Sequence, residues 1–308
     1  MINDYMSKEH SHLPPGILDE RMVPDNNFDR LWESIIIDPQ LKDNILCQAI
    51  SNFTLRQRVS RDIIPLHGII LLVGPPGTGK TSLARGLAST IARAIKGPQI
   101  RFLEVEPHSL ASSALGKSQK AVTELLGSTI VEYVEQGPVI VLLDEVETLA
   151  TDRKKLSMDA NPVDVHRATD AVLAQLDHLA ERYPSLLFIA TSNFEGAIDE
   201  AFLSRADLVL TIPLPNADAR RDILISTLLG LAQTYPSATG ISKSPEFERL
   251  VALTEGLDGR KIRKLIAAAC SFNRETAVDP NRLAISDLIR AAEQAKGQAR
   301  HASGGGAK

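Results

Sequence analysis

The sequence has few cysteines, few aromatic residues, no excess of basic charge and no long apolar run. Its two cysteines, Cys47 and Cys270, lie far apart without metal-ligand spacing, which favours reduced thiols over a disulfide framework or a zinc site. No apolar stretch approaches the ~18 residues of a membrane-spanning helix, and the segment 1–20 is too polar for a signal peptide. The net charge of -4 and the aromatic content of 4% argue against a generally basic nucleic-acid binder. These absences favour a soluble, cytoplasmic protein without a membrane partner.

The chain has ample material for a hydrophobic core. It contains 308 residues, of which 44% are hydrophobic. This length suits one large domain and a smaller one.

A glycine-rich segment directly follows the apolar run 69–73 and matches the phosphate-loop pattern GxxxxGK[ST] at every fixed position. Its glycines let successive backbone N–H groups face a polyphosphate, and the helix expected from Lys80 adds its positive dipole end. Lys80 is expected to reach the β and γ phosphates of ATP, and the Thr81 hydroxyl to ligate Mg2+. The alternative is a glycine and proline turn between a buried strand and a helix. The predicted ATP-binding residues are Gly74, Pro75, Pro76, Gly77, Thr78, Gly79, Lys80, Thr81 and Ser82.

A second apolar run, 138–143, ends in two adjacent carboxylates, Asp144 and Glu145. Period-2 geometry sends neighbouring side chains to opposite faces of a strand, but residues beyond the strand end need not stay opposed. Asp144 is expected to hold Mg2+ through water and Glu145 to act on the attacking water. The alternative is a solvated acidic turn.

Short apolar runs alternate with helical patterns along the first two thirds of the chain. Such alternation predicts an α/β fold with a five-stranded, mostly parallel sheet covered on both faces, and with ligands at the carboxyl ends of the strands. The expected strands are 68–73, 100–105, 139–143, 186–190 and 208–212, and the clearest helices between them are 82–94 and 163–180.

The pattern changes after Ile212, where Pro213 and Pro215 interrupt the chain. Helical stretches follow at 217–232, 245–253, 259–272 and 285–295, which predicts a small all-helical domain. We therefore expect a flexible segment at 1–27, with order beginning near Phe28 and a helical pattern from 31 to 59. A large ATPase domain at 28–214, a helical lid at 215–298 and a disordered tail at 299–308 complete the predicted organisation.

Three polar residues lie where they can complete an ATPase site. Asn193 ends an apolar strand and can orient the attacking water, although it can equally be a turn former or a helix cap. Arg205 precedes the last strand and can reach the nucleotide of a neighbouring subunit, where it would neutralise charge on the γ phosphate. Its alternative is a surface ion pair with Asp207. Arg260 begins a helix of the small domain and can touch the γ phosphate, or it is a helix-surface arginine beside Asp258.

In this order, the phosphate loop, the paired carboxylates, the three polar residues and the helical lid resemble the AAA+ ATPases, a class of P-loop NTPases. The chain is most similar to the pachytene-checkpoint/thyroid-receptor-interactor family of HORMA-domain remodellers. The motifs that carry this resemblance span about 28 to 270 and are 28–34 (FDRLWES), 79–83 (GKTSL), 144–147 (DEVE), 171–177 (AVLAQLD), 204–207 (SRAD) and 255–260 (EGLDGR).

The resemblance implies a ring of six copies that uses ATP to pull on a HORMA protein and convert it from a closed, partner-bound state to an open one. It implies that Arg205 is the arginine finger, Arg260 the lid sensor and Asn193 the sheet-side sensor. The implied pore loop is 108–117, where substrate would contact Ala114, Leu115, Gly116 and Lys117. An aromatic residue usually grips substrate at the position of Ala114, so Leu115 is the only sizeable apolar contact that this loop offers.

Eukaryotic members of this family have an added substrate-adaptor domain at the amino end, whereas this sequence has about two dozen polar residues before the helix expected from Leu31 and so resembles the compact bacterial members. These occur with HORMA proteins and cyclic-oligonucleotide synthases in anti-phage signalling systems (CBASS). The implied role is to disassemble the HORMA-synthase complex and hold the defence response off.

Two other function classes share parts of this sequence. A nucleic-acid motor or loader would need basic and aromatic residues near the pore, where the lysines are Lys117, Lys120, Lys154 and Lys155. A non-hydrolysing nucleotide switch is the third class, and the presence of Glu145, Asn193 and Arg205 argues against it.

Overall fold

The computed structural model describes residues 13–95, 97–106, 117–148, 150 and 162–304. Its described residues group into two compact units. Unit 1 contains the described parts of 1–34, 42–74 and 80–211, and unit 2 contains 35–41, 75–79 and the chain from Ile212 onward. The sequence pattern suggested a lid that begins at 215. No pattern assigned the two short segments, 35–41 and 75–79, to it.

Unit 1 is built on a six-stranded sheet in the order β1-β3-β4-β5-β2-β6. All neighbouring strands are parallel except β1, which runs antiparallel to β3. The strands are β1 Ile17–Val23, β2 Ile69–Val73, β3 Ile100–Val105, β4 Val139–Leu143, β5 Leu186–Ser192 and β6 Leu208–Thr211. Every residue of β2, β4 and β5 is buried, as expected for parallel strands that are covered on both faces. The predicted α/β class and mostly parallel sheet are confirmed.

The sheet has one strand more than the predicted five, because β1 lies within the segment 1–27 that was expected to be flexible. The expectation that order begins near Phe28 is therefore wrong for the strand. Its sequence, ILDERMV, carries three consecutive charged residues, and Leu18 and Met22 are exposed. An edge strand has a neighbour on one side only and does not need a continuous apolar run. The apolar runs of the sequence therefore did not predict β1.

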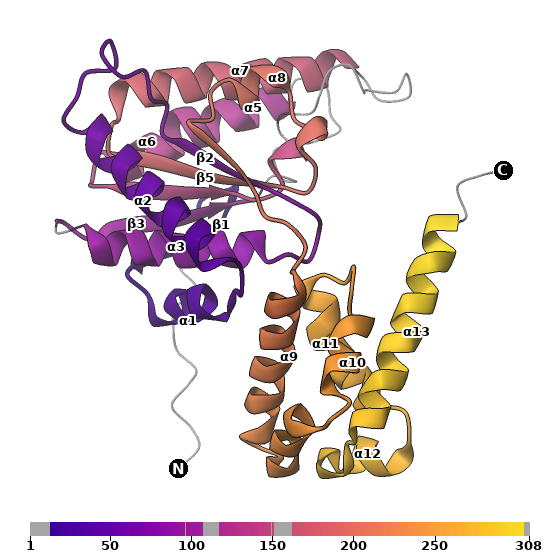
Figure 1. The fold of residues 1–308 in the computed structure, drawn as a ribbon. Helices are drawn as coiled ribbons and strands as arrows, with labels where there is room; N and C mark the ends of the chain where they lie inside the picture. Colours follow the sequence, from indigo (N-terminus) through magenta and orange to yellow (C-terminus); the bar gives the residue numbers. More distant parts are fainter. Residues whose placement is uncertain (1–12, 96, 107–116, 149, 151–161, 305–308) are drawn as a thin grey trace. The chain divides into compact units, whose positions relative to one another are not determined.

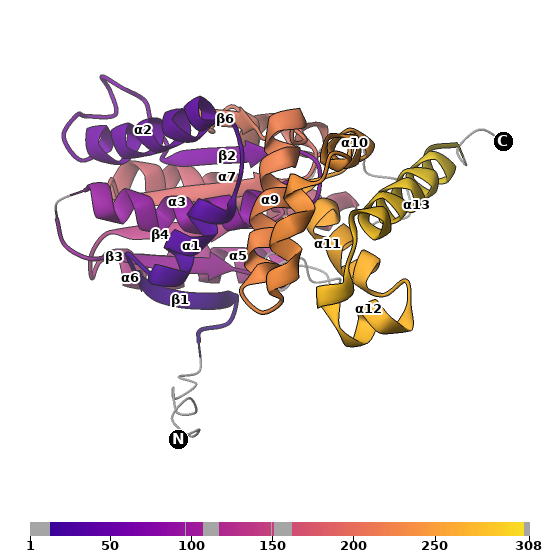
Figure 2. The same cartoon turned by 60° about the horizontal axis from the view of Figure 1, so that its bottom comes forward.

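Helices lie on both faces of this sheet (Figure 1). On one face, a continuous core joins the strand residues Ile69, Leu71 and Val141 to apolar side chains of α5 and α7. On the other face lie α1 and α3, which pack against each other (Figures 1 and 2). The predicted helical pattern 31–59 forms two helices, α1 and α2, and Pro39 begins the second. The helical elements of unit 1 are α1 Asn26–Ser34, α2 Pro39–Arg56, α3 Lys80–Ala94, α5 Lys117–Glu124, the π-helix η1 Leu125–Thr129, α6 Ile130–Val134, η2 Val146–Thr148, α7 Pro162–Arg182, η4 Glu195–Ala197 and α8 Glu200–Leu203.

The described part of unit 2 is helical beyond Ile212 and has its own core, which includes Leu224, Leu250, Ile262 and Leu288. Three α-helices of this unit begin at side chains that accept a backbone N–H: Asn216, Asp258 and Asn273. The helices are α9 Ala217–Ala232, η5 Pro236–Lys243, α10 Phe247–Leu253, α11 Gly259–Cys270, α12 Arg274–Val278, η6 Pro280–Arg282 and α13 Ile285–Gly304.

Candidate functional site

The phosphate loop connects β2 to α3, as the sequence predicted. Gly77 and Gly79 have φ angles of +83° and +90°, a backbone region that residues with a Cβ rarely adopt. A Cβ atom on Gly77 would lie 2.3 Å from Oδ1 of Asp258, and one on Gly79 would lie 2.6 Å from Cδ1 of Ile35. The loop therefore requires glycine at both positions for its conformation, and at Gly77 also for space, because the Asp258 side chain is held as the cap of α11.

Lys80 begins α3 and is 6% exposed. Its Nζ donates to the carbonyl of Gly74 at 2.8 Å and to Oδ1 of Asn193 at 3.1 Å. A buried ammonium group is costly unless hydrogen bonds compensate its lost hydration. The side chain is therefore held between the phosphate loop and the end of β5.

Asp144 follows β4 and accepts hydrogen bonds from two threonine hydroxyls. Thr81 Oγ1 donates to the carboxylate at 2.9 Å and 3.2 Å, and Thr191 Oγ1 donates to Oδ1. Sequence reasoning missed Thr191, which it treated as part of an apolar strand. The parallel register pairs Leu143 with Ala190, so the next residue on each strand, Asp144 and Thr191, are neighbours.

Glu145 is the one described non-glycine residue with a positive φ, at +51°. A side chain in this sparsely populated region costs roughly 1–3 kcal/mol, and such residues concentrate at functional sites. The turn lets the Glu145 N–H donate to Thr191 Oγ1 at 3.1 Å and brings its Oε1 to 3.3 Å from Nδ2 of Asn193. The adjacent carboxylates thus have different partners.

Asn193 connects the cation and the second carboxylate, because its Oδ1 accepts from Lys80 and its Nδ2 donates to Glu145. Its own backbone N–H donates to Oε1 of Glu147 at 3.1 Å. The structure brings Asn193 to the predicted site and does not use it as a helix cap. Glu147, from the DEVE motif, had no role in the sequence-based site.

Arg205 does not pair with Asp207, so the sequence-based alternative for this residue is wrong. Its Nε and Nη2 donate to the two carboxylate oxygens of Asp177 at 2.8 Å and 2.7 Å, and Nη1 donates to the carbonyl of Ala201 at 2.7 Å. Hydrogen bonding to Asp177 raises the pKa of Arg205, and the reciprocal bond lowers the pKa of Asp177. Asp207 instead accepts the backbone N–H groups of His67, Gly68 and Ile69 at the start of β2.

Arg260 lies in unit 2, at the second position of α11. Its backbone N–H donates to the carbonyl of Gly77 at 3.3 Å, and the neighbouring Asp258 caps α11 through the Lys261 N–H at 2.8 Å. The phosphate loop and the start of α11 are therefore joined by backbone and side-chain contacts within unit 2.

A pocket of about 90 Å3 lies in unit 2 beside the phosphate loop. Its lining is mainly apolar, and sequence reasoning did not find it because its residues come from four separated segments. They include Ile36, Leu41, Thr78, Pro213, Ile223 and Gly259.

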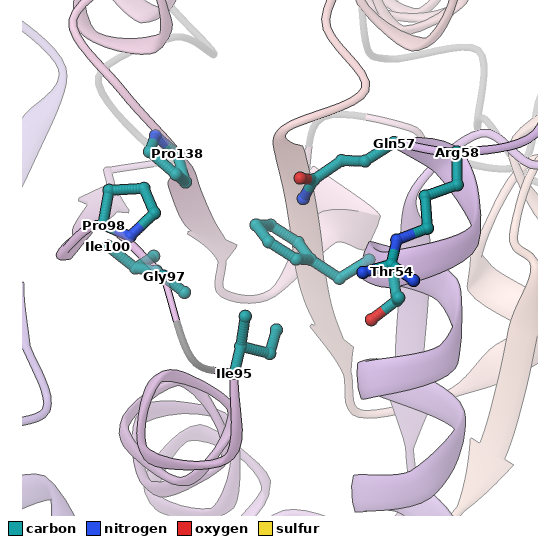
Figure 3. Close-up of a pocket in the computed structure, with 9 residues that line it drawn as sticks. Thr54, Gln57, Arg58, Ile95, Gly97, Pro98, Ile100 and Pro138 are labelled. Atoms are coloured by element: carbon teal, nitrogen blue, oxygen red, sulfur yellow. The ribbon is translucent and has the colours of Figure 1, made fainter.

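A second cavity, of about 150 Å3, lies in unit 1 at the amino ends of β3 and β4 (Figure 3). Thr54, Gln57 and Arg58 line one side of it, and Pro98 and Pro138 lie on the other side (Figure 3). The phosphate loop and both carboxylates follow the carboxyl ends of their strands, so this cavity is not part of their site.

Several predicted features are not tested by this geometry. The pore-loop residues Ala114, Leu115 and Gly116 lie outside the described residues, as do Lys154 and Lys155, and Lys117 is described only as the start of α5.

Over the described residues, no helix is long and apolar enough to cross a membrane. No group of three or more histidine, cysteine, aspartate or glutamate side chains there has the arrangement of a metal site.

The chain is similar to known proteins in sequence and in fold. A profile for the "ATPase family associated with various cellular activities (AAA)" matches residues 70–214. The chain is 55% identical over 284 residues to "CD-NTase-associated protein 6" of Pseudomonas aeruginosa, which covers 92% of this chain and 93% of that protein. It is 37% identical over 246 residues to the "Pachytene checkpoint protein 2 homolog" of Arabidopsis thaliana, covering 77% of this chain and 52% of the plant protein, about half its length.

Solved structures with a similar fold include the following two. Caenorhabditis elegans PCH-2 has a TM-score of 0.72 and 29% identity, over 93% of this chain and 77% of that chain. A chain of the Escherichia coli MS115-1 HORMA:CdnC:Trip13 complex has a TM-score of 0.70 and 19% identity, over 91% of this chain and 95% of that chain.

Proposed function

Because the chain belongs to the AAA ATPases, in the family of its CD-NTase-associated and pachytene-checkpoint relatives, we propose that it remodels a HORMA-domain protein at the expense of ATP. The observation that carries the ATPase part is the chain of contacts from Lys80 through Asn193 to Glu145. It joins a phosphate-binding cation to a carboxylate at the carboxyl ends of adjacent parallel strands.

Mg2+ is the metal that fits the donor set of this site. The Thr81 hydroxyl and the Asp144 carboxylate, 2.9 Å apart, are hard oxygen donors, and Mg2+ in ATPases is held by one or two such groups together with phosphate oxygens. When bound, the ion would neutralise charge on the β and γ phosphates. Thr191 would keep the Asp144 carboxylate oriented toward Thr81.

Three side chains of unit 1 would act on the triphosphate. Lys80 would exchange its bond to the Gly74 carbonyl for phosphate oxygens, which an ammonium with three donors can do without losing Asn193. Glu145 would accept a proton from the water that attacks the γ phosphate, and the Asn193 amide would hold the carboxylate in the required direction. The apolar pocket beside Thr78 and Gly259 would take the adenine base.

Two arginines would complete the catalytic machinery. Arg205 would reach the γ phosphate bound by a neighbouring copy, so that hydrolysis requires a ring, which the resemblance sets at six copies. Arg260 would sense the γ phosphate from α11, whose first turn already contacts Gly77.

The substrate part of the proposal comes from the relatives. A CD-NTase-associated protein is 55% identical to this chain, and a protein of the same fold occurs in a HORMA:CdnC:Trip13 complex. We infer that the ring engages a HORMA protein bound to a cyclic-oligonucleotide synthase, converts it from closed to open and so separates the two. Binding substrate with different affinity in each nucleotide state would turn hydrolysis into work. The gripping loop at Ala114 and Leu115 remains a prediction.

The test compares two inactive variants, Glu145→Gln and Lys80→Ala, in a pull-down with a purified HORMA–synthase complex. Glu145→Gln should bind ATP, hydrolyse it at least roughly 100-fold more slowly and retain the HORMA protein, because only the water-activating carboxylate is lost. Lys80→Ala should retain little of it, because the phosphate contact is lost. Rapid hydrolysis by Glu145→Gln would refute its assignment, and equal capture by both variants would contradict ATP-dependent engagement.

A further inference from the structure

The guanidinium of Arg205 is held in one direction by a carboxylate from another helix. Asp177, on α7, accepts from Nε and Nη2, and the Ala201 carbonyl accepts from Nη1. An arginine fork has five N–H donors, and these contacts use one donor on each nitrogen. One N–H group on Nη1 and one on Nη2 are not used by these contacts, and the outer end of the fork between these two nitrogens is a position where two phosphate oxygens can bind arginine.

The exposure of this pair argues that stability is not its main contribution. The Arg205 side chain is 23% exposed and the Asp177 side chain 41% exposed. Ion pairs that are this accessible to water typically contribute ~0–1 kcal/mol, even though a two-pronged pair fixes the direction of the arginine well. What the contact gives Arg205 is mainly orientation.

Other groups near Asp177 do not compete for it at neutral pH. His67 Nε2 lies 3.5 Å from Asp177 Oδ1, but the same nitrogen is 2.7 Å from Nη2 of Arg61, an arrangement in which the neutral ring accepts from the arginine. Burial and the Arg61 charge lower the pKa of His67, which keeps the ring neutral. Arg205 is therefore the direct cationic partner of Asp177 among the described residues.

We propose that Asp177 is the positioning residue of the arginine finger: it aims the outer N–H groups of Arg205 at the γ phosphate held by the neighbouring subunit. This inference rests on the proposed trans role of Arg205. Without its hydrogen bonds to Asp177, the long Arg205 side chain samples several rotamers. Misplacement of a catalytic group by about 1 Å lowers the rate ~100-fold. The loss should be smaller than the 10³ to 10⁵ that an arginine finger contributes.

The test begins with Asp177→Asn, which keeps the shape of the side chain and removes its charge. Its kcat for ATP should fall roughly 10- to 100-fold while KM changes less than about 3-fold, because each subunit keeps its own phosphate loop. Glu181→Gln removes an exposed carboxylate from the same helix and should keep wild-type kcat. Wild-type kcat in Asp177→Asn would overturn the proposal.

Mixed rings separate positioning from a general structural defect. Glu145→Gln subunits cannot hydrolyse ATP themselves, but they keep both Asp177 and Arg205. When they are mixed with Asp177→Asn subunits, they should supply a correctly held Arg205 to the intact ATP sites of those subunits and so raise turnover there. Arg205→Ala subunits mixed in the same way are the reference. If Glu145→Gln restores Arg205→Ala but not Asp177→Asn, the positioning role is wrong while the trans finger stands. If Glu145→Gln subunits restore neither Arg205→Ala nor Asp177→Asn, Arg205 does not act in trans, and the positioning role of Asp177 is wrong as well.

A double-variant comparison tests the same proposal when Asp177→Asn is less stable than the wild type. If Asp177 acts through Arg205, then Asp177→Asn should not lower the kcat of Arg205→Ala further. A further loss of about 10-fold in that background would show an independent effect of Asp177 and overturn the proposal.

Discussion

At the scale of single residues, the phosphate loop shows why a glycine can be irreplaceable. Gly77 combines a φ of +83° with a contact to Asp258, which itself caps α11. A substitution there must either distort the loop or displace the cap. Gly230, in the exposed part of α9, has no atom within 4 Å of where its Cβ would be.

We therefore expect Gly77→Ala to weaken ATP binding by about 10-fold or more, since backbone strain of this kind costs roughly 1–3 kcal/mol. Binding of a fluorescent ATP analogue and the thermal unfolding midpoint would measure it. Gly230→Ala is the matched control in the same unit and should bind ATP normally, with stability raised by up to ~1 kcal/mol. Equal ATP affinity in the two variants would contradict the requirement for glycine.

At the scale of elements, the start of β2 depends on a cluster of charged groups from distant parts of unit 1. Asp207 accepts three consecutive backbone N–H groups at 2.6–3.0 Å, beginning at His67. His67 also contacts Arg61, and it lies near Asp177, which holds Arg205. The attachment of β2 and the direction of Arg205 therefore share one polar network.

The lowered pKa of His67 predicts how this network responds to acid. The folded state binds the proton more weakly than the unfolded state, whose pKa is about 6.5. The contribution of a neutral His67 to stability is thus complete above pH 6.5 and is lost as the pH falls through the lowered folded pKa. The thermal unfolding midpoint of the wild type should decrease as the pH is lowered from 7 to 5. The decrease should be smaller in His67→Gln.

His178→Gln, which removes an exposed histidine from α7, is the control for this pH series. The carboxylates whose pKa is lowered, Asp29, Asp177 and Glu248, lose their contributions only below their ordinary values of 3.8 and 4.5, outside the measured window. If His178→Gln flattens the pH dependence as much as His67→Gln does, the effect does not come from the β2 network.

At the scale of the whole molecule, a finger that acts in trans makes nucleotide part of the contact between copies. Glu145→Gln with ATP should then sediment as a ring of six, and without ATP as smaller species. Adding Arg205→Ala to this variant should raise the protein concentration needed for assembly by roughly 10-fold, a cost of about 1.4 kcal/mol. Sedimentation velocity over a concentration series would measure it.

The control for assembly is Arg249→Ala in the same Glu145→Gln background. Arg249 is an exposed arginine of α10 that pairs with Glu246 and Glu293, and exposed pairs of this kind contribute little. Equal assembly of the two double variants, or assembly that does not depend on ATP, would mean that Arg205 does not join copies through the nucleotide.

Features that are local in the sequence were predictable from it. Short contiguous patterns carry the five parallel strands, the phosphate loop with Lys80 and Thr81, and the carboxylates Asp144 and Glu145. Strand β1 could not be predicted in this way, because its charged residues suit an edge position and give no apolar pattern. The apolar pocket of unit 2 could not be predicted either, because its lining comes from four separated segments.

What the sequence alone determined is the set of chemical groups and the strand ends on which they lie, since both follow from motifs a few residues long. The tertiary structure decided which groups meet: Thr191 with Asp144, Asn193 with Lys80 and Glu145, and Asp177 rather than Asp207 with Arg205. These partners are 28 to 113 positions apart along the chain. Their pairing depends on strand register and helix placement, which only the packed fold supplies.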